Sequence, residues 1–475
     1  MPIKPVSPVI ILLIGMVIVL GGILALRLHP AIALLVGALV VGGLTSDSSL
    51  QLYALDTGMS GTAISDLLNQ SLGQRVALAF GNTCGRIGIL IALASIIGKC
   101  LLESGAAERI VRGMVRLLGE KRAPFSFLGS SYLLAIPVYF DTVFYLMIPL
   151  ARAMGVRKKQ QYPLYVMGII AGGVMAHSLV PPTPGPLFVA GELGVNLGLM
   201  IIMGFIVGLL CAMGGLIYSY WLNTRQNIPL RDTADATIED LEKWSSRAGS
   251  NLPSLTWSIL PVLLPVILIA GDTISSLSHD IPAWVHTFFS IFGDPVIALF
   301  IAVVVALFLI LRHYQFAFRE IQKPVQDALY SAGVIILITA SGGAFGAMLQ
   351  QTAIGSVIAG WAPDYHLAVL PLAFFITAIV RTAQGSATVA MITAVGILGA
   401  FNSDILGFHP VYLAIVIGCG SKLFPWMNDS GFWIICKMSG FTEGETIRNF
   451  SFLLSVMGVV GLAATMILAR FLPLI

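Results

Sequence analysis

Long apolar runs, separated by short polar segments, set the pattern of the sequence. A helix needs about 20 apolar residues to cross the hydrocarbon core of a bilayer. Runs close to that length predict ten transmembrane helices, and therefore an all-α polytopic membrane protein. They lie near residues 8–26, 29–45, 86–104, 163–193, 195–222, 255–271, 293–312, 326–350, 410–435 and 448–472.

Two further apolar stretches, 124–151 and 364–402, are interrupted near their middle. Basic residues collect on the cytoplasmic side of membrane proteins, and they flank the first stretch on both sides, at 109–122 and 152–159. A single crossing would place one basic cluster outside, whereas a hairpin that enters and returns keeps both inside. We therefore expect re-entrant hairpins at both stretches.

The remaining basic residues set the predicted orientation. Lys and Arg also cluster at 225–247 and 312–323, whereas 46–74 and 272–292 contain neither. This distribution places both termini outside and the long polar connector, 223–253, in the cytoplasm.

The two halves of the chain resemble each other. Residues 98–110 align with 346–358, and 162–173 align with 409–420, at an offset of about 247 residues. Because each half has an odd number of spans, the second copy must have the opposite orientation, an arrangement typical of secondary transporters. A bundle of unrelated spans is the alternative. The predicted organisation is a first repeat over 1–222, the connector over 223–253 and an inverted second repeat over 254–475.

Composition agrees with a membrane protein. Of the 475 residues, 57% are hydrophobic and 10% are charged, with a mean hydropathy of +0.92, whereas soluble domains carry roughly a quarter charged residues. The net charge of +3 and the lack of basic runs give no sign of nucleic-acid binding. The five cysteines lack metal-ligand spacing, and we expect neither a metal nor a cofactor.

Four interruptions carry most of the polar chemistry of the apolar segments. They are Asp141 with Thr142 in the first hairpin, the break at 176–186, the segment RTAQGSATV in the second hairpin and the break at 424–432. Unpaired backbone groups cost several kcal/mol in hydrocarbon, so unwound segments must face protein or a water-filled cavity. Half-helices that begin there can bind an anion at their N-termini. We therefore expect the breaks to meet at one site for a small anionic substrate.

The candidate substrate-binding residues come from these four interruptions. They are Asp141, Thr142, His177, Thr183, Gly185, Arg381, Gln384, Gly385, Ser386, Thr388, Asn428, Asp429 and Ser430. Asp141, His177 and Asp429 are also candidates for proton coupling, because carboxyl and imidazole groups in a partly dry site can exchange a proton. A structural hydrogen bond is the alternative role for each.

Arg381 is a charge in an apolar context, where charges mark function or a paired counter-ion. It could bind a substrate carboxylate, pair with Asp141 or Asp429, or extend to the outer surface of the membrane. Three other charges near helix ends are expected at the membrane interface: Lys99, Glu103 and Lys422.

The segments HSLVPPTPGP, RTAQGSATVAMITA and WMNDSGFW resemble the gluconate:proton symporter family of the ion transporter superfamily, and the similarity runs nearly end to end. The resemblance implies a proton-driven symporter for gluconate, a related sugar acid or D-serine, in the bacterial cytoplasmic membrane. It also implies a moving transport domain that contains both hairpins, and a scaffold domain of a kind that often forms a homodimer. The matching residues are His177, Pro181, Pro182, Pro184, Gly185, Gly385, Ser386, Ala387, Thr388, Asn428, Asp429 and Gly431.

This chain departs from the family pattern near the expected pocket. The family commonly has a second histidine where Thr183 stands, a proline where Ser430 stands and a glutamate where Asp141 stands. The polar segment 46–82 also looks longer than usual. These differences leave the identity of the substrate open.

Functions of other classes have weaker support. Intramembrane enzymes use motifs such as GxGD, HExxH or DDxxD, which the sequence lacks. A channel is an alternative because broken helices can line pores, and sodium coupling is an alternative because half-helix carbonyls can coordinate the ion.

Overall fold

The computed structural model describes residues 6–231, 252–277, 281–317, 319–354, 368–398 and 406–474. Within these ranges every regular element is a helix, which confirms the predicted all-helical class. The first half contains α1 (Pro8–Leu24), α2 (Pro30–Leu44), α3 (Asp47–Asp56), α4 (Gly61–Asn69), α5 (Leu72–Glu103), α6 (Ala106–Leu118), α7 (Ala123–Leu134), α8 (Phe140–Arg157), α9 (Tyr162–Leu179), α10 (Pro184–Glu192) and α11 (Leu197–Asn223). The second half contains α13 (Leu255–Leu277), α14 (Ala283–Phe292), α15 (Pro295–His313), α16 (Gln322–Gln350), α18 (Val369–Gln384), α19 (Ala387–Leu398), α21 (Val411–Gly420), α22 (Ser430–Ser439), α23 (Glu443–Thr446) and α24 (Phe452–Phe471).

Among the described residues, seven helical segments are long and apolar enough to cross a membrane. They are α5, α9 with α10, α11, α13, α15, α16 and α23 with α24. The pair α2 and α3, which meet at a bend of 101°, is an eighth candidate. All ten predicted spans fall on helices, but α1 and α21 are too short to meet this criterion, so the count of ten stays a prediction.

Helix α5 is longer than the apolar pattern predicts. It begins at Leu72, where reciprocal hydrogen bonds between Ser71 and Gln74 form a capping box, well before the predicted start. The first turns carry Arg75 and Asn82, which a lipid-facing helix would exclude. In the structure both side chains line a cavity instead.

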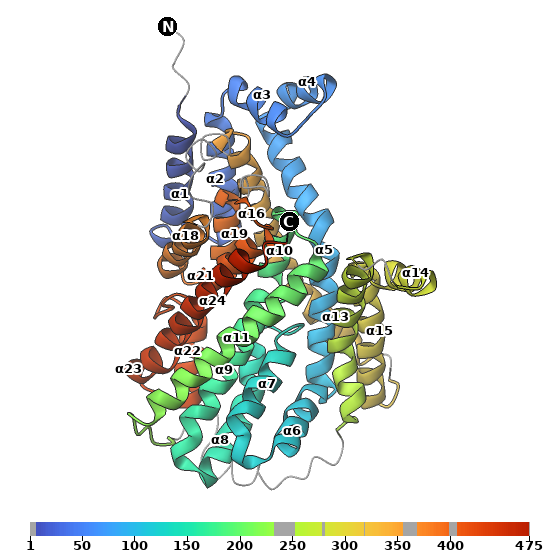
Figure 1. Cartoon of the computed structure of the whole chain (residues 1–475), viewed down its shortest axis with the longest axis vertical. Helices are drawn as coiled ribbons and strands as arrows, with labels where there is room; N and C mark the ends of the chain where they lie inside the picture. The colour runs from blue at the N-terminus through green and yellow to red at the C-terminus, as the bar shows by residue number, and fades with distance from the viewer. Residues whose placement is uncertain are drawn as a thin grey trace.

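Polar segments outside the predicted spans also form helices. Helices α3 and α4 pack on each other through Leu50, Ala54 and Leu67, and they lie at the upper end of the molecule in Figure 1. Helix α14 leaves Trp284 74% exposed. Exposed tryptophan is typical of a membrane–water interface.

Two groups of packed helices form the body of the molecule. In one group, α5 and α16 run alongside each other, with α2 on α16 and α15 on α5. In the other, α9 packs against α7 and α11, and α11 packs against α24. Figure 1 shows α1 to α4 at one end and α6, α8 and α23 at the other. The ends of α6 and α8 carry the basic clusters at 109–122 and 152–159.

Helices α7 and α9 cross at short distance. A Cβ atom added to Gly172 would collide with the backbone oxygen of Leu128 and the hydroxyl of Ser131, and one added to Gly168 would lie 2.8 Å from the backbone oxygen of Pro124. Small residues permit such close approach, and packing drives helix association in membranes because lipid is as apolar as the side chains.

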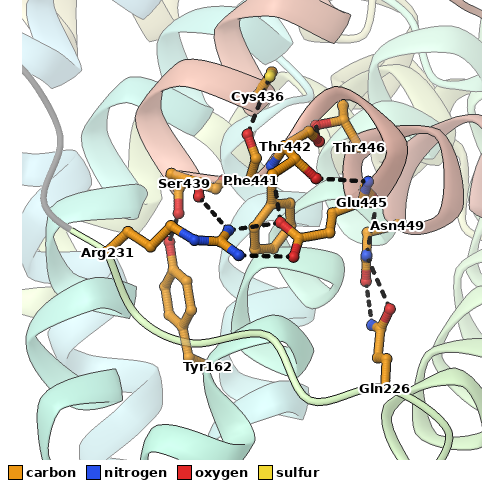
Figure 2. Close-up of polar contacts among 11 residues, drawn as sticks. Tyr162, Gln226, Arg231, Cys436, Ser439, Phe441, Thr442, Glu445, Thr446 and Asn449 are labelled. Atoms are coloured by element: carbon orange, nitrogen blue, oxygen red, sulfur yellow. Dashed lines mark hydrogen bonds and ion pairs between the residues drawn. The ribbon is translucent and has the colours of Figure 1, made fainter.

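The start of the connector is fixed to the last part of the chain, as Figure 2 shows. The Arg231 guanidinium forms two hydrogen bonds with the Glu445 carboxylate, at 2.6 and 2.9 Å, and donates another to the backbone oxygen of Gly440 at 2.8 Å. Nearby, the Gln226 side-chain amide donates a hydrogen bond to the Asn449 side-chain oxygen at 2.7 Å. These contacts tie the two halves together at the lower end of Figure 1.

We expect Gly172→Ala to destabilise the purified protein by about 1–3 kcal/mol, because the added methyl group overpacks the α7–α9 crossing. Gly333→Ala is the matched control, since a Cβ at Gly333 in α16 meets nothing within 4 Å. The measurement is the thermal unfolding midpoint in detergent. Equal midpoints for the two variants would contradict this packing.

Candidate functional site

The membrane helices unwind at four places, 135–139, 180–183, 385–386 and 421–429. After each break a new helix begins, namely α8, α10, α19 and α22. Each of these helices starts with backbone N–H groups that have no partner within the helix. The four breaks therefore supply four half-helix N-termini.

Residues from all four break regions line one cavity of about 320 Å³, hereafter the central cavity. Eight of the predicted site residues lie in its wall: Asp141, His177, Arg381, Gly385, Ser386, Thr388, Asp429 and Ser430. Ile335, Ile338 and Thr339 of α16, with Phe450 and Leu454, complete a more apolar side.

The last two breaks are in direct contact. Gly385 has a φ of +84°, in the left-handed region, and a Cβ there would collide with the backbone oxygen of Asn428. The Trp426 indole N–H and the Asn428 amide both donate to the backbone oxygen of Thr382, at 2.9 and 2.8 Å. Glycine is thus required at position 385 by both its backbone angle and its neighbour.

Arg381 is held at the centre of this contact. Its side chain is 4% exposed, and it forms an ion pair with Asp429 through Nη2. Nε donates to the backbone oxygen of Ser421 at 3.0 Å. Nη1 is buried and has no partner among the described residues. The guanidinium therefore does not extend to the membrane surface, and one of its nitrogens remains available to a ligand.

Two carboxylates lie at helix N-termini beside the cavity. Asp429 is the N-cap of α22, and its Oδ1 accepts a hydrogen bond of 2.7 Å from the Gly431 amide. Asp141 lies in the first turn of α8. A Cβ added to Gly431 would lie 3.2 Å from an oxygen of Asp429 and 3.7 Å from an oxygen of Asp141, so both carboxylates flank this glycine.

Lys422 is the principal residue that the sequence analysis misplaced. It was expected at the interface, but it is 2% exposed and lines the central cavity. No carboxylate in the described part of the chain lies within ion-pair distance of its ammonium group. The prediction was wrong because the fourth break begins at 421, earlier than the apolar pattern indicated, and places this lysine inside the unwound segment.

Further polar groups complete the wall. His177 Nδ1 and Ser178 Oγ are buried and lack partners among the described residues. The His177 ring meets the Tyr139 ring edge-on at 5.8 Å, and the Tyr139 hydroxyl lies 3.2 Å from the hydroxyl of Ser95. Tyr139 and Thr339 were not among the sequence candidates, because a tyrosine and a threonine in apolar segments resemble ordinary packing residues.

Four of the predicted site residues do not line the central cavity: Thr142, Thr183, Gly185 and Asn428. Thr183 donates to the backbone oxygen of Val180 at 2.8 Å, which closes the turn before α10. A Cβ at Gly185 would collide with the end of Met391, so this glycine lets α10 approach α19. The side chain of Gln384 lies outside the described part of the structure.

The lining combines charged and uncharged polar groups. Arg381 and Lys422 provide positive charge, Asp141 and Asp429 provide negative charge, and buried hydroxyl and imidazole groups provide hydrogen-bonding partners. Buried polar groups without partners are rare in folded proteins, and clusters of them mark ligand sites or bound water.

The sequence is similar to that of known transport proteins. A high-affinity gluconate transporter of Escherichia coli (strain K12) is 29% identical over 96% of this chain and 97% of its own length. The D-serine transporter DsdX of Escherichia coli O6:H1 is 30% identical over 96% of this chain and 97% of its own.

A solved structure has a similar fold. MtrF of Neisseria gonorrhoeae, described as illuminating a class of antimetabolite efflux pumps, matches 83% of this chain and 84% of its own with a TM-score of 0.62 and 15% identity. A family model described as GntP family permease matches residues 7–471. The chain therefore belongs to the GntP permease family and is a membrane transporter rather than an enzyme.

Proposed function

We propose that this permease imports a small hydroxylated carboxylate of the gluconate class, together with a proton, by alternating access. The observation that carries the proposal is the pair of cations in the central cavity: Lys422 has no ion-pair partner among the described residues, and Arg381 keeps a free buried nitrogen. Relatives named for gluconate and D-serine support an organic-acid substrate. A cavity of about 320 Å³ is at the small end of ligand sites.

The formal charge of the cavity supports proton coupling. Two cations, Arg381 and Lys422, face two carboxylates, Asp141 and Asp429, so the empty site is neutral when all four are ionised. A bound monoanion would leave one uncompensated negative charge, which is costly away from water. Protonation of one carboxylate restores neutrality, and Asp141 is our candidate because Asp429 is already committed to Arg381 and to the α22 N-terminus.

The proposed transport cycle requires a particular topology. We propose that the two halves, 1–222 and 254–475, are inverted repeats with hairpins near 124–151 and 364–402, and that both termini lie outside a bacterial inner membrane. The basic ends of α6 and α8 support this orientation. Meeting breaks from both halves support a site at the repeat interface. A homodimer formed through a scaffold domain is part of the same proposal.

D-serine is the second candidate substrate. Its ammonium group would face Asp141, which has no ion-pair partner among the described residues. A zwitterion adds no net charge, so the neutrality argument for proton coupling applies to gluconate and not to D-serine.

The test of substrate and coupling is uptake into proteoliposomes of labelled gluconate and of D-serine, driven by a proton gradient alone or by a sodium gradient alone. We expect gluconate to accumulate with the proton gradient. Asp141→Asn should abolish accumulation but retain exchange of internal for external substrate, because exchange requires no net proton release. Asp66→Asn, at an exposed position on α4, is the control.

Accumulation of gluconate by Asp141→Asn at the wild-type level would remove Asp141 from the coupling mechanism. Accumulation driven only by sodium would overturn proton symport. Uptake of D-serine without uptake of gluconate would identify D-serine, rather than gluconate, as the substrate.

We expect Lys422→Gln to raise the half-saturating gluconate concentration by about 10- to 100-fold, the effect of losing one charge-assisted hydrogen bond of about 1.5–3 kcal/mol. Lys422→Arg should retain part of the affinity. Lys437→Gln is the control, since Lys437 is exposed in the last turn of α22. The measurement is initial uptake rate against substrate concentration, and an unchanged value for Lys422→Gln would refute the role of this lysine.

A further inference from the structure

A second cavity, hereafter the outer cavity, lies between α5, α16, α10 and the pair α3 and α4. Its volume is about 400 Å³, and its wall is rich in charged and amide side chains. Arg75, Arg86 and Glu192 supply its charges, while Asn82, Gln350 and Gln351 supply amides. The polar residues that the sequence analysis found in 46–82 thus contribute to a cavity.

Arg75 is a buried cation without an ion-pair partner among the described residues. The residue is 8% exposed. Its guanidinium donates hydrogen bonds to the Gln351 amide oxygen at 2.8 Å and to the Gly42 backbone oxygen at 3.1 Å. Nε is buried and has no partner among the described residues. The negative charge of Asp47 attracts the Arg75 guanidinium electrostatically, but the two groups lie beyond ion-pair distance.

The other two charges of the outer cavity largely cancel each other. Arg86 forms an ion pair with Glu192 and donates to the backbone oxygen of Gly191 at 2.9 Å. The outer cavity therefore carries a formal charge of one positive unit, on Arg75. A buried charge without a counter-ion is costly, and an anion in the cavity would remove that cost.

The outer cavity shares walls with the central cavity. Along α16, Thr339 lines the central cavity, and Gly343 and Ala347, one and two turns further, line the outer cavity. Along α10, Pro184 lines the first and Glu192 the second. In the wall of the outer cavity, a Cβ at Gly343 of α16 would collide with Thr83 of α5, so these two helices touch there.

We propose that the outer cavity is a second binding site, selective for organic carboxylates, from which the substrate passes to the central cavity. Arg75 binds the carboxylate, and the amides of Asn82 and Gln350 bind hydroxyl groups. The inference rests on the proposed function for the identity of the carboxylate and for the passage of substrate to the central cavity. The anion selectivity of the cavity is a property that can be measured without transport.

The test uses charged thiol reagents on the full chain in intact cells. Asn82→Cys is combined with Cys84→Ser, because Cys84 is partly exposed whereas the other four cysteines are buried. The rates of modification by the anionic reagent 2-sulfonatoethyl methanethiosulfonate and by its cationic trimethylammonium analogue give a selectivity ratio. Thr62→Cys, at an exposed position on α4, gives the ratio for an open surface.

We expect the selectivity ratio of Asn82→Cys to favour the anionic reagent more than the ratio of Thr62→Cys does. Adding Arg75→Gln should lower the ratio by about fivefold or more, because this removes one unit charge a few ångströms from the thiol. Arg75→Lys, which keeps the charge, should keep the ratio. Arg86→Gln, at a half-exposed position, should also lower it. Gluconate should slow modification, whereas uncharged glucose should not.

A ratio equal to that of Thr62→Cys, or unchanged by both Arg75→Gln and Arg86→Gln, would overturn the anion site. Labelling from the cytoplasmic side alone would overturn its role in loading. If the modification rates show the expected charge selectivity but the protein does not take up gluconate, the anion site is supported and gluconate is rejected as the substrate.

Discussion

Backbone that leaves the helical conformation inside a membrane must find partners in the protein, and this constraint determines how the site is built. The nine-residue break at 421–429 shows the consequence. Its Trp426 and Asn428 side chains bond the Thr382 backbone, and the Phe424 amide donates to the Ser455 hydroxyl at 2.9 Å. The bonds to Thr382 hold the break against the tip between α18 and α19, and the bond to Ser455 holds it against α24. The polar lining of the central cavity follows from the same requirement.

The charges in the central cavity divide into a structural pair and a responsive pair. Arg381 and Asp429 neutralise each other, and each is also bonded to backbone, so together they join α18 to α22. Lys422 and Asp141 lack such partners among the described residues. In the proposed cycle, a ligand or a proton changes the balance of the second pair without breaking the first, so the fold of the site persists through binding and release.

The apolar pattern predicted the helices well because lipid imposes a simple rule on every exposed segment. Each of the ten predicted spans falls on a helix, and eight predicted site residues line one cavity. The pattern failed where polar residues face the protein interior, as for Lys422 and for the early turns of α5 around Arg75. Hydropathy cannot distinguish a charge at the membrane surface from a charge beside a buried cavity. Thr183 and Asn428 were expected to contact the ligand, but their side chains donate hydrogen bonds to backbone oxygens. The same residue types serve either role, so the sequence alone does not distinguish the two.

Helices α16 and α19, which both line the central cavity, meet in a close apolar contact. Helices α16 and α19 meet where a Cβ on Gly342 would collide with Ile392, and where the Cα atoms of Gly346 and Gly396 approach closely. No side-chain hydrogen bond joins these helices in the part of the chain that the structure describes. Van der Waals contacts between glycines can separate and re-form without leaving a polar group unpaired, whereas hydrogen bonds in a dry site would resist separation. The alternating access proposed above requires a closure that opens readily, and a contact of this kind is compatible with it.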